Sequence, residues 1–125
     1  MKLGISSYCL DREIEQGRMT LAEAIDWVAA QGAQCMELVP FAFRFDDPAT
    51  GKIDTQAIAQ VKKQARDAGV ELCNYSVLAD LCREGEAQRA EIDRLKHEID
   101  IAAELGLPRM RHDVCAFRRP QGQNT

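Results

Sequence analysis

The chain has 125 residues, of which 46 % are hydrophobic and 29 % are charged, a composition that is typical of a globular domain and excludes disordered or collagen-like chains. The formal net charge of −4 argues against non-specific binding to nucleic acid or to an anionic membrane surface. No apolar run approaches the roughly 18 residues that a membrane-spanning helix needs. The charge and the lack of such a run together lead us to expect neither nucleic acid nor membrane as a partner.

The first residues and the cysteines indicate the cellular compartment. Met1 and Lys2 lead into a short strand-like run rather than into the long apolar helix of a signal peptide. The chain has five cysteines, which are Cys9, Cys35, Cys73, Cys82 and Cys115. We interpret them as reduced side chains packed as small hydrophobes in a cytoplasmic protein. A thiolate metal site is the alternative, and the absence of any C-x-x-C spacing disfavours it.

A repeat organises the chain. In three segments a helical stretch ends at a glycine and a strand-like run follows, and the three glycines, Gly32, Gly69 and Gly106, lie 37 residues apart. Glycine just past a helix end tolerates the left-handed backbone conformation that ends the helix. The equal spacing therefore predicts a repeating strand–helix unit.

Each predicted helix has an apolar face. The first begins at Thr20, with Glu23 three residues later in a capping box, the second begins after Asp54 as N-cap, and the third covers about 84–105. The residues expected to be buried are Leu21, Ala24, Ile25 and Val28 in the first helix, Ile58, Val61, Ala65 and Ala68 in the second, and Ile92, Leu95, Ile99 and Ala102 in the third.

The predicted strands cover 2–8, 35–39, 71–77 and 109–114, which gives the order β-α-β-α-β-α-β. Crossovers of this length connect parallel strands, so the chain is α/β. Two architectures fit, an open doubly wound sheet and part of a (βα)8 barrel. No G-x-G-x-x-G or Walker-type phosphate loop follows the first strand.

Polar residues at the carboxyl ends of the predicted strands favour the barrel, because barrel enzymes build their sites at that end. These residues are Ser6, Ser7, Tyr8, Glu37, Asn74, Ser76, Arg111, His112 and Asp113.

The segments MKLGISSYCL, GAQCMELV, AGVELCNYSV and LGLPRMRHDV resemble the N-terminal half of a sugar phosphate isomerase/epimerase of the xylose isomerase-like TIM barrel superfamily. The resemblance covers residues 1–117 and leaves a polar tail, 118–125. Eight units of this length would need roughly 300 residues, so we expect half of a (βα)8 TIM barrel, either a fragment or a natural truncation. Its two edge strands predict completion by self-association, as a homodimer or another homo-oligomer.

The resemblance implies a small sugar or sugar phosphate as substrate and a divalent metal (Mn, Mg, Co or Zn) as cofactor. The metal ligands of the isomerase branch lie on later strands, so this chain would supply pocket walls. Two alternatives remain open. One is a non-catalytic, self-associating half-barrel, and the other is a relative of the zinc-dependent abasic-site endonucleases. In the endonuclease branch a zinc-binding His lies at a similar point of the fourth strand, which implies His112 as a metal ligand.

Glu37 lies mid-strand between apolar residues, where a carboxylate must be paired or must face a polar cavity. It either lines the substrate pocket or is a structural group whose partner is Arg111. Strand alternation places Arg111 and Asp113 on one face and His112 on the other. Both roles, substrate site and structural group, remain open for these three residues.

Asn74 and Ser76 share one face of their strand, where they either line a sugar site or fill the barrel floor. Tyr8 is a candidate for stacking on a sugar ring. In residues 41–45 phenylalanine occupies every second position, and this pattern predicts either a lid over a substrate or a cap over the core. The predicted substrate-binding residues are Tyr8, Glu37, Asn74, Arg111 and Asp113.

Three further polar residues are assigned no chemistry. His97 is expected on a solvated helix face, and Asp46 and Asp47 are expected to form a turn before Pro48.

Overall fold

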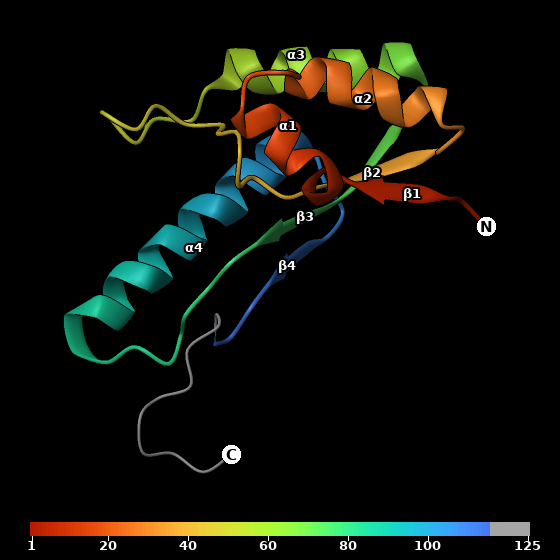
Figure 1. The fold of residues 1–125 in the computed structure, drawn as a ribbon. Coiled ribbons are helices and arrows are strands. Elements are labelled where there is room, and N and C mark those ends of the chain that lie inside the picture. Colours follow the sequence, from red (N-terminus) through yellow and green to blue (C-terminus); the bar gives the residue numbers. More distant parts are fainter. Residues whose placement is uncertain (116–125) are drawn as a thin grey trace.

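The computed structural model describes residues 1–115, so the predicted tail, 118–125, and the last residues of the predicted domain lie outside the described residues. Its elements are β1 (Gly4–Ser6), a 3-10 helix η1 (Ser7–Leu10), α1 (Asp11–Glu15), α2 (Leu21–Ala30), β2 (Cys35–Leu38), α3 (Thr55–Ala68), β3 (Glu71–Val77), α4 (Gly85–Leu105) and β4 (Met110–His112) (Figure 1).

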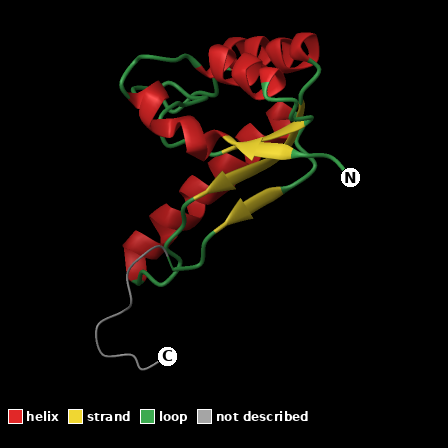
Figure 2. Cartoon of the chain, turned by 45° about the vertical axis from the view of Figure 1, so that its right-hand side comes forward, coloured by secondary structure: helices red, strands yellow, loops and turns green. Residues whose placement is uncertain are grey.

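The four strands form one parallel sheet in the order β1-β2-β3-β4. Helices α2, α3 and α4 all lie on the same side of this sheet, as Figures 1 and 2 show. A doubly wound sheet reverses its strand order and carries helices on both faces. Sequential order with helices on one face is the arrangement of a (βα)8 barrel. The described residues therefore form the predicted half of a TIM barrel.

The predicted helix ends are confirmed. Thr20 Oγ1 accepts the Glu23 N–H at 3.2 Å while the Glu23 carboxylate accepts the Thr20 N–H at 2.7 Å, which completes the capping box of α2. Asp54 caps α3 through the Ala57 N–H at 2.9 Å. The three repeat glycines have φ of 71–77°, in the left-handed region.

The core lies between the sheet and the three long helices. The side chains buried most deeply in it are Ile25, Val28, Met36, Leu38, Ile58 and Tyr75. The predicted buried faces of α2 and α3 are confirmed at their centres, since Ala24, Ile25, Val28, Ile58, Val61 and Ala65 are buried.

The predicted buried face of α4 is half wrong. Leu95 and Ala102 are buried as predicted, but Ile92 and Ile99 are 38 % and 55 % exposed. Glu91 is buried in the same helix. The carboxylate of Glu91 accepts hydrogen bonds from the Asp80 N–H and from Arg94, and these donors offset the cost of burying its charge. The helix can therefore turn Glu91 inward and leave an isoleucine pair in solvent.

The N-terminal strand is shorter than predicted. β1 ends at Ser6, and η1 and α1, which the sequence did not predict, follow directly. Ser7 starts this turn because its buried Oγ accepts the Val39 N–H at 2.7 Å and donates to the Val39 carbonyl at 3.3 Å. Ser7 thus holds the end of β1 to the end of β2 and is not a site residue.

Among the five cysteines, all within residues 1–115, none forms a disulfide. Cys35 and Cys73 are half-buried, but Cys9, Cys82 and Cys115 are exposed, so the prediction that the cysteines pack as core hydrophobes is wrong for these three. In the part of the chain described here, no helix is both long and apolar enough to cross a membrane.

Candidate functional site

A cavity of about 590 Å³ lies where the carboxyl ends of the four strands meet. Its lining comes from every strand or from the loop that follows it. The residues are Ser6, Tyr8, Glu37, Val39, Phe41, Ser76, Val77, Leu78, Arg111, Asp113 and Cys115. This is the end of the sheet at which barrel enzymes bind their substrates, and the volume is in the range of small-ligand sites.

Glu37 is the acidic centre of this cavity. Its Oε1 accepts hydrogen bonds from Ser76 Oγ at 2.6 Å and from Asn74 Nδ2 at 2.8 Å. Partial burial raises the pKa of Glu37, but the hydrogen bonds from Ser76, Ser6 and Asn74 and the positive charge of Arg111 outweigh it, so the pKa lies below its usual value. Glu37 is therefore ionised at neutral pH.

A register shift creates this arrangement. Met36 pairs with Leu72, but the next residue, Glu37, pairs with Asn74, so Cys73 is an extra residue on β3. Such a bulge redirects the side chains that follow it. Asn74 and Ser76 then face Glu37 from the neighbouring strand, and Asn74 Nδ2 also donates to Ser76 Oγ at 2.9 Å.

Arg111 and Asp113 form an ion pair at the cavity, with Arg111 Nη2 2.8 Å from Asp113 Oδ1. The prediction that both lie on one face is confirmed, because both line the cavity. The prediction that Arg111 pairs directly with Glu37 is wrong, because the side-chain partner of Arg111 is Asp113. Arg111 binds Asp113 and acts on Glu37 through its charge.

The aromatic residues divide between the site and the core. Tyr8 packs edge-to-face against Phe41, with ring centroids 5.7 Å apart, and both line the cavity. Phe45 is buried and packs edge-to-face on Phe43. Phe45 therefore caps the core as predicted, Phe41 lines the cavity, and the role of this segment as a lid stays a prediction.

The structure places the other predicted residues around rather than in the cavity. Asn74 supports Glu37 without lining the cavity wall. His112 is exposed, and its Nδ1 lies 2.8 Å from its neighbour's backbone oxygen, Asp113 O. Its role as a metal ligand stays a prediction.

The predicted set of substrate-binding residues leaves out seven residues that line the cavity, which are Ser6, Val39, Phe41, Ser76, Val77, Leu78 and Cys115. Strand alternation already placed Ser76 on the face of Asn74 as a candidate for lining a sugar site, and it is the signal that could have included Cys115, two residues after Asp113.

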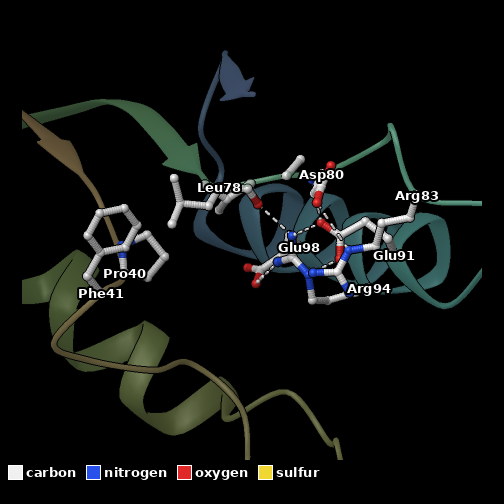
Figure 3. A pocket seen from close by; sticks show the side chains of 10 residues that line it. Pro40, Phe41, Leu78, Asp80, Arg83, Glu91, Arg94 and Glu98 are labelled. Carbon is white, nitrogen blue, oxygen red and sulfur yellow. Dashed lines mark hydrogen bonds and ion pairs between the residues drawn. The ribbon is translucent and has the colours of Figure 1, made fainter. Parts of the chain in front are cut away.

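A second pocket of about 320 Å³ adjoins the first, with Pro40 and Phe41 on one side and charged residues of α4 on the other (Figure 3). Arg94 Nη2 donates to Glu91 Oε1 at 2.8 Å and also to the Leu78 carbonyl. The Arg94 hydrogen bond, opposed by partial burial and aided by the Asp80 N–H, lowers the pKa of Glu91 to about 2. The charged side chains of this pocket pair with one another, so we assign them a structural role.

The cavity does not present the donor set of a hard divalent cation, which prefers several free oxygen ligands. Glu37 and Asp113 already accept hydrogen bonds from the protein. Within residues 1–115, the group of possible ligands that converges on one point is Asp80, Cys82 and Cys115, and it contains one carboxylate only. The metal of the isomerase branch therefore does not fit the described cavity residues.

These features define an α/β half-barrel with a polar cavity at the carboxyl ends of its strands. The family model of the xylose isomerase-like TIM barrel matches residues 25–122, and the chain belongs to this family. A comparison with curated proteins gave no match.

Proposed function

We propose that the chain forms one wall of the active site of an isomerase or epimerase that acts on a small sugar or sugar phosphate. The observation that carries this proposal is the ionised Glu37 in a cavity that Arg111, Asp113 and the Tyr8–Phe41 pair surround. A sugar offers hydroxyl groups to carboxylates and to arginine, and its C–H face packs on aromatic rings. The family supports the barrel, and the cavity supports the ligand class.

Sugar isomerisation removes a proton beside a carbonyl and returns it, and negative charge develops on the oxygens. Glu37 is a poor base for this step, because its pKa is lowered and its Oε1 is already hydrogen-bonded. Its role in the proposal is to accept hydroxyl hydrogen bonds and orient the sugar. Arg111 supplies donors to an oxyanion or a phosphate. The proton-transferring bases and the divalent cation belong, in this proposal, to the strands that complete the barrel.

Titration of the chain with ketoses, aldoses and their phosphates, followed by NMR shifts of the cavity amides, tests this proposal. We expect millimolar binding, with Glu37→Gln and Arg111→Met each weakening it about tenfold, because each removes a charge-assisted hydrogen bond. Arg89→Met is the matched control, since Arg89 is exposed on α4 and outside the cavity. Binding that Arg89→Met weakens as much as Arg111→Met would contradict the proposed site.

Catalysis is tested separately. Each sugar that binds is incubated in D₂O with the chain and with Mn²⁺, Mg²⁺ or Co²⁺, and deuterium in the recovered sugar is measured. Incorporation shows that the chain itself catalyses proton exchange. Binding without incorporation restricts the chain to a pocket wall, and absence of both overturns the proposal.

A second candidate function, a self-associating half-barrel without catalysis, is supported by the uncovered parts of the fold. Within the described residues, β1 and β4 each pair on one side only, and Ile92 and Ile99 are exposed on α4. Two copies that join β4 to β1 in both directions would give eight strands around one axis. The oligomeric state of the chain tests this candidate.

A further inference from the structure

Three possible metal ligands converge beside the cavity, outside the sugar-binding residues. The carboxylate of Asp80 and the Sγ atoms of Cys82 and Cys115 all lie within 4.8 Å of one another. Asp80 and Cys82 belong to the loop after β3, and Cys115 follows β4. The three residues therefore come from two neighbouring loops at the carboxyl end of the sheet.

The spacing and the chemistry of these atoms suit one ion. Tetrahedral Zn²⁺ binds thiolate sulfur at about 2.3 Å and carboxylate oxygen at about 2.0–2.2 Å, so its ligands lie roughly 3.5–3.8 Å apart. Small rotations of the exposed Cys82 and Cys115 side chains would bring the ligand atoms from their present separation, which is within 4.8 Å, to this spacing. Two thiolates select a soft or borderline ion over Mg²⁺ or Ca²⁺.

The backbone already holds the two loops together. The Leu81 N–H donates to the Val114 carbonyl at 2.8 Å, and Asp80 and Cys115 form an antiparallel bridge. Cys82 Sγ lies 3.9 Å from the same Val114 carbonyl. These backbone contacts fix the place at which the two loops meet.

Asp80 is also held in place, at its backbone and at its side chain. Glu91 accepts the Asp80 N–H at 2.9 Å (Figure 3), and Arg83 Nε lies 3.4 Å from Asp80 Oδ2. A carboxylate that binds a metal through one oxygen keeps the other for a neighbouring donor, and such donors orient metal ligands in proteins. Arg83 can therefore remain on Asp80 when an ion is bound.

We propose that Asp80, Cys82 and Cys115 bind one Zn²⁺ ion, with water as the fourth ligand, and that this ion clips the loop after β3 to the segment after β4. Binding releases the two thiol protons to solvent. Cys115 lines the large cavity, so the ion lies at its edge. The proposal does not depend on the sugar-binding function.

Zinc titration of the full, reduced chain against a chromophoric chelator tests the site. We expect one Zn²⁺ per chain, and Co²⁺ in its place should show thiolate charge-transfer bands and tetrahedral d–d bands. Cys82→Ser and Cys115→Ser should each weaken zinc binding by more than about a hundredfold, which exceeds the loss from removing a supporting residue. Circular dichroism checks that each variant is folded, and Cys82→Ser should leave sugar binding unchanged.

Three variants are controls that should retain the ion. Cys9→Ser removes another exposed thiol, the Cys35→Ser/Cys73→Ser double variant removes the half-buried pair on the sheet, and His112→Ala removes the imidazole three positions before Cys115 in the sequence. A wild-type chain that binds no zinc overturns the proposal. So does zinc binding that survives Cys82→Ser but is lost in His112→Ala, because that result assigns the ion to the histidine.

Discussion

The carboxylates of Glu37, Glu91 and Asp46 have lowered pKa values because each accepts hydrogen bonds from several donors, some close in the sequence and some from distant segments. Glu37 receives donors from the neighbouring strand, and Glu91 receives the N–H of Asp80 together with Arg94. Asp46 is a third case, because Arg44 Nε lies 2.9 Å from its Oδ1 and His97 Nε2 lies 3.2 Å from its Oδ2. The expectation that His97 is on a solvated face is therefore wrong, since it is half-buried against the loop after β2.

Asp46→Asn should lower stability at neutral pH and have little effect in acid. The hydrogen bond from Arg44, opposed by partial burial and aided by His97, lowers the pKa of Asp46 below its ordinary value of 3.8. A lowered pKa stabilises the fold above pH 4, and that contribution is lost as the pH falls through the folded-state pKa. Urea unfolding at pH 7 should show a loss of about 1–2 kcal/mol.

At pH 2.5 the difference between wild type and Asp46→Asn should shrink towards zero. Asp100→Asn is the control, since Asp100 is exposed on α4. An equal loss at both pH values would show that the charge of Asp46 is not what stabilises the loop.

At the scale of elements, local chemistry sets the ends of the helices and the sheet sets their faces. Gly69 ends α3 with φ of 71°, and its amide donates to the Arg66 carbonyl at 3.1 Å. No atom within 4 Å would meet a Cβ at this position, so the conformation of the backbone, and not crowding, requires glycine.

Gly69→Ala should therefore destabilise the chain by about 1 kcal/mol, the cost of a Cβ in the left-handed region. Gly69→Asn should lose less, because asparagine tolerates this conformation. Thermal unfolding of the two variants measures the difference. Equal losses would show that a property other than φ determines this position.

The sequence could predict these helix ends because caps depend on a few adjacent residues. It could not predict which apolar stripe of α4 faces the core, because Leu95 and Ala102 compete with Ile92 and Ile99 and the sheet decides between them. Residues of the site were found by alternation along each strand. Their partners were not, because the pairing of Glu37 with Asn74 depends on the bulge in β3.

At the scale of the whole molecule, the sheet has one covered face and one that bears the cavity. The sequential parallel order and the one-sided helices are consequences of the equal repeats, so the half-barrel could be predicted from the sequence. The convergence of Asp80, Cys82 and Cys115 could not, because it depends on the bridge between two loops that are more than thirty residues apart.

Self-association is the prediction that belongs to this scale. Parallel sheets in proteins are covered on both faces and their edges are protected, whereas β1 and β4 are edge strands within the described residues. Exposed apolar patches mark interaction surfaces, and Ile92 and Ile99 are exposed on α4. Sedimentation velocity of the full chain over a range of concentrations should therefore show a dimer that dissociates on dilution. The Ile92→Lys/Ile99→Lys double variant should shift the equilibrium towards monomer, because it places charges on the exposed face of α4.

Gln88→Lys/Lys96→Gln is the matched control, since it alters exposed polar residues of the same helix without changing its net charge. It should dimerise like wild type. The prediction for the double isoleucine variant requires that the dimer bury the face of α4 that bears Ile92 and Ile99 as well as the edge strands. A dimer that resists the double isoleucine variant would therefore place the contact at the β1 and β4 edges. A monomer at every concentration would contradict self-association altogether.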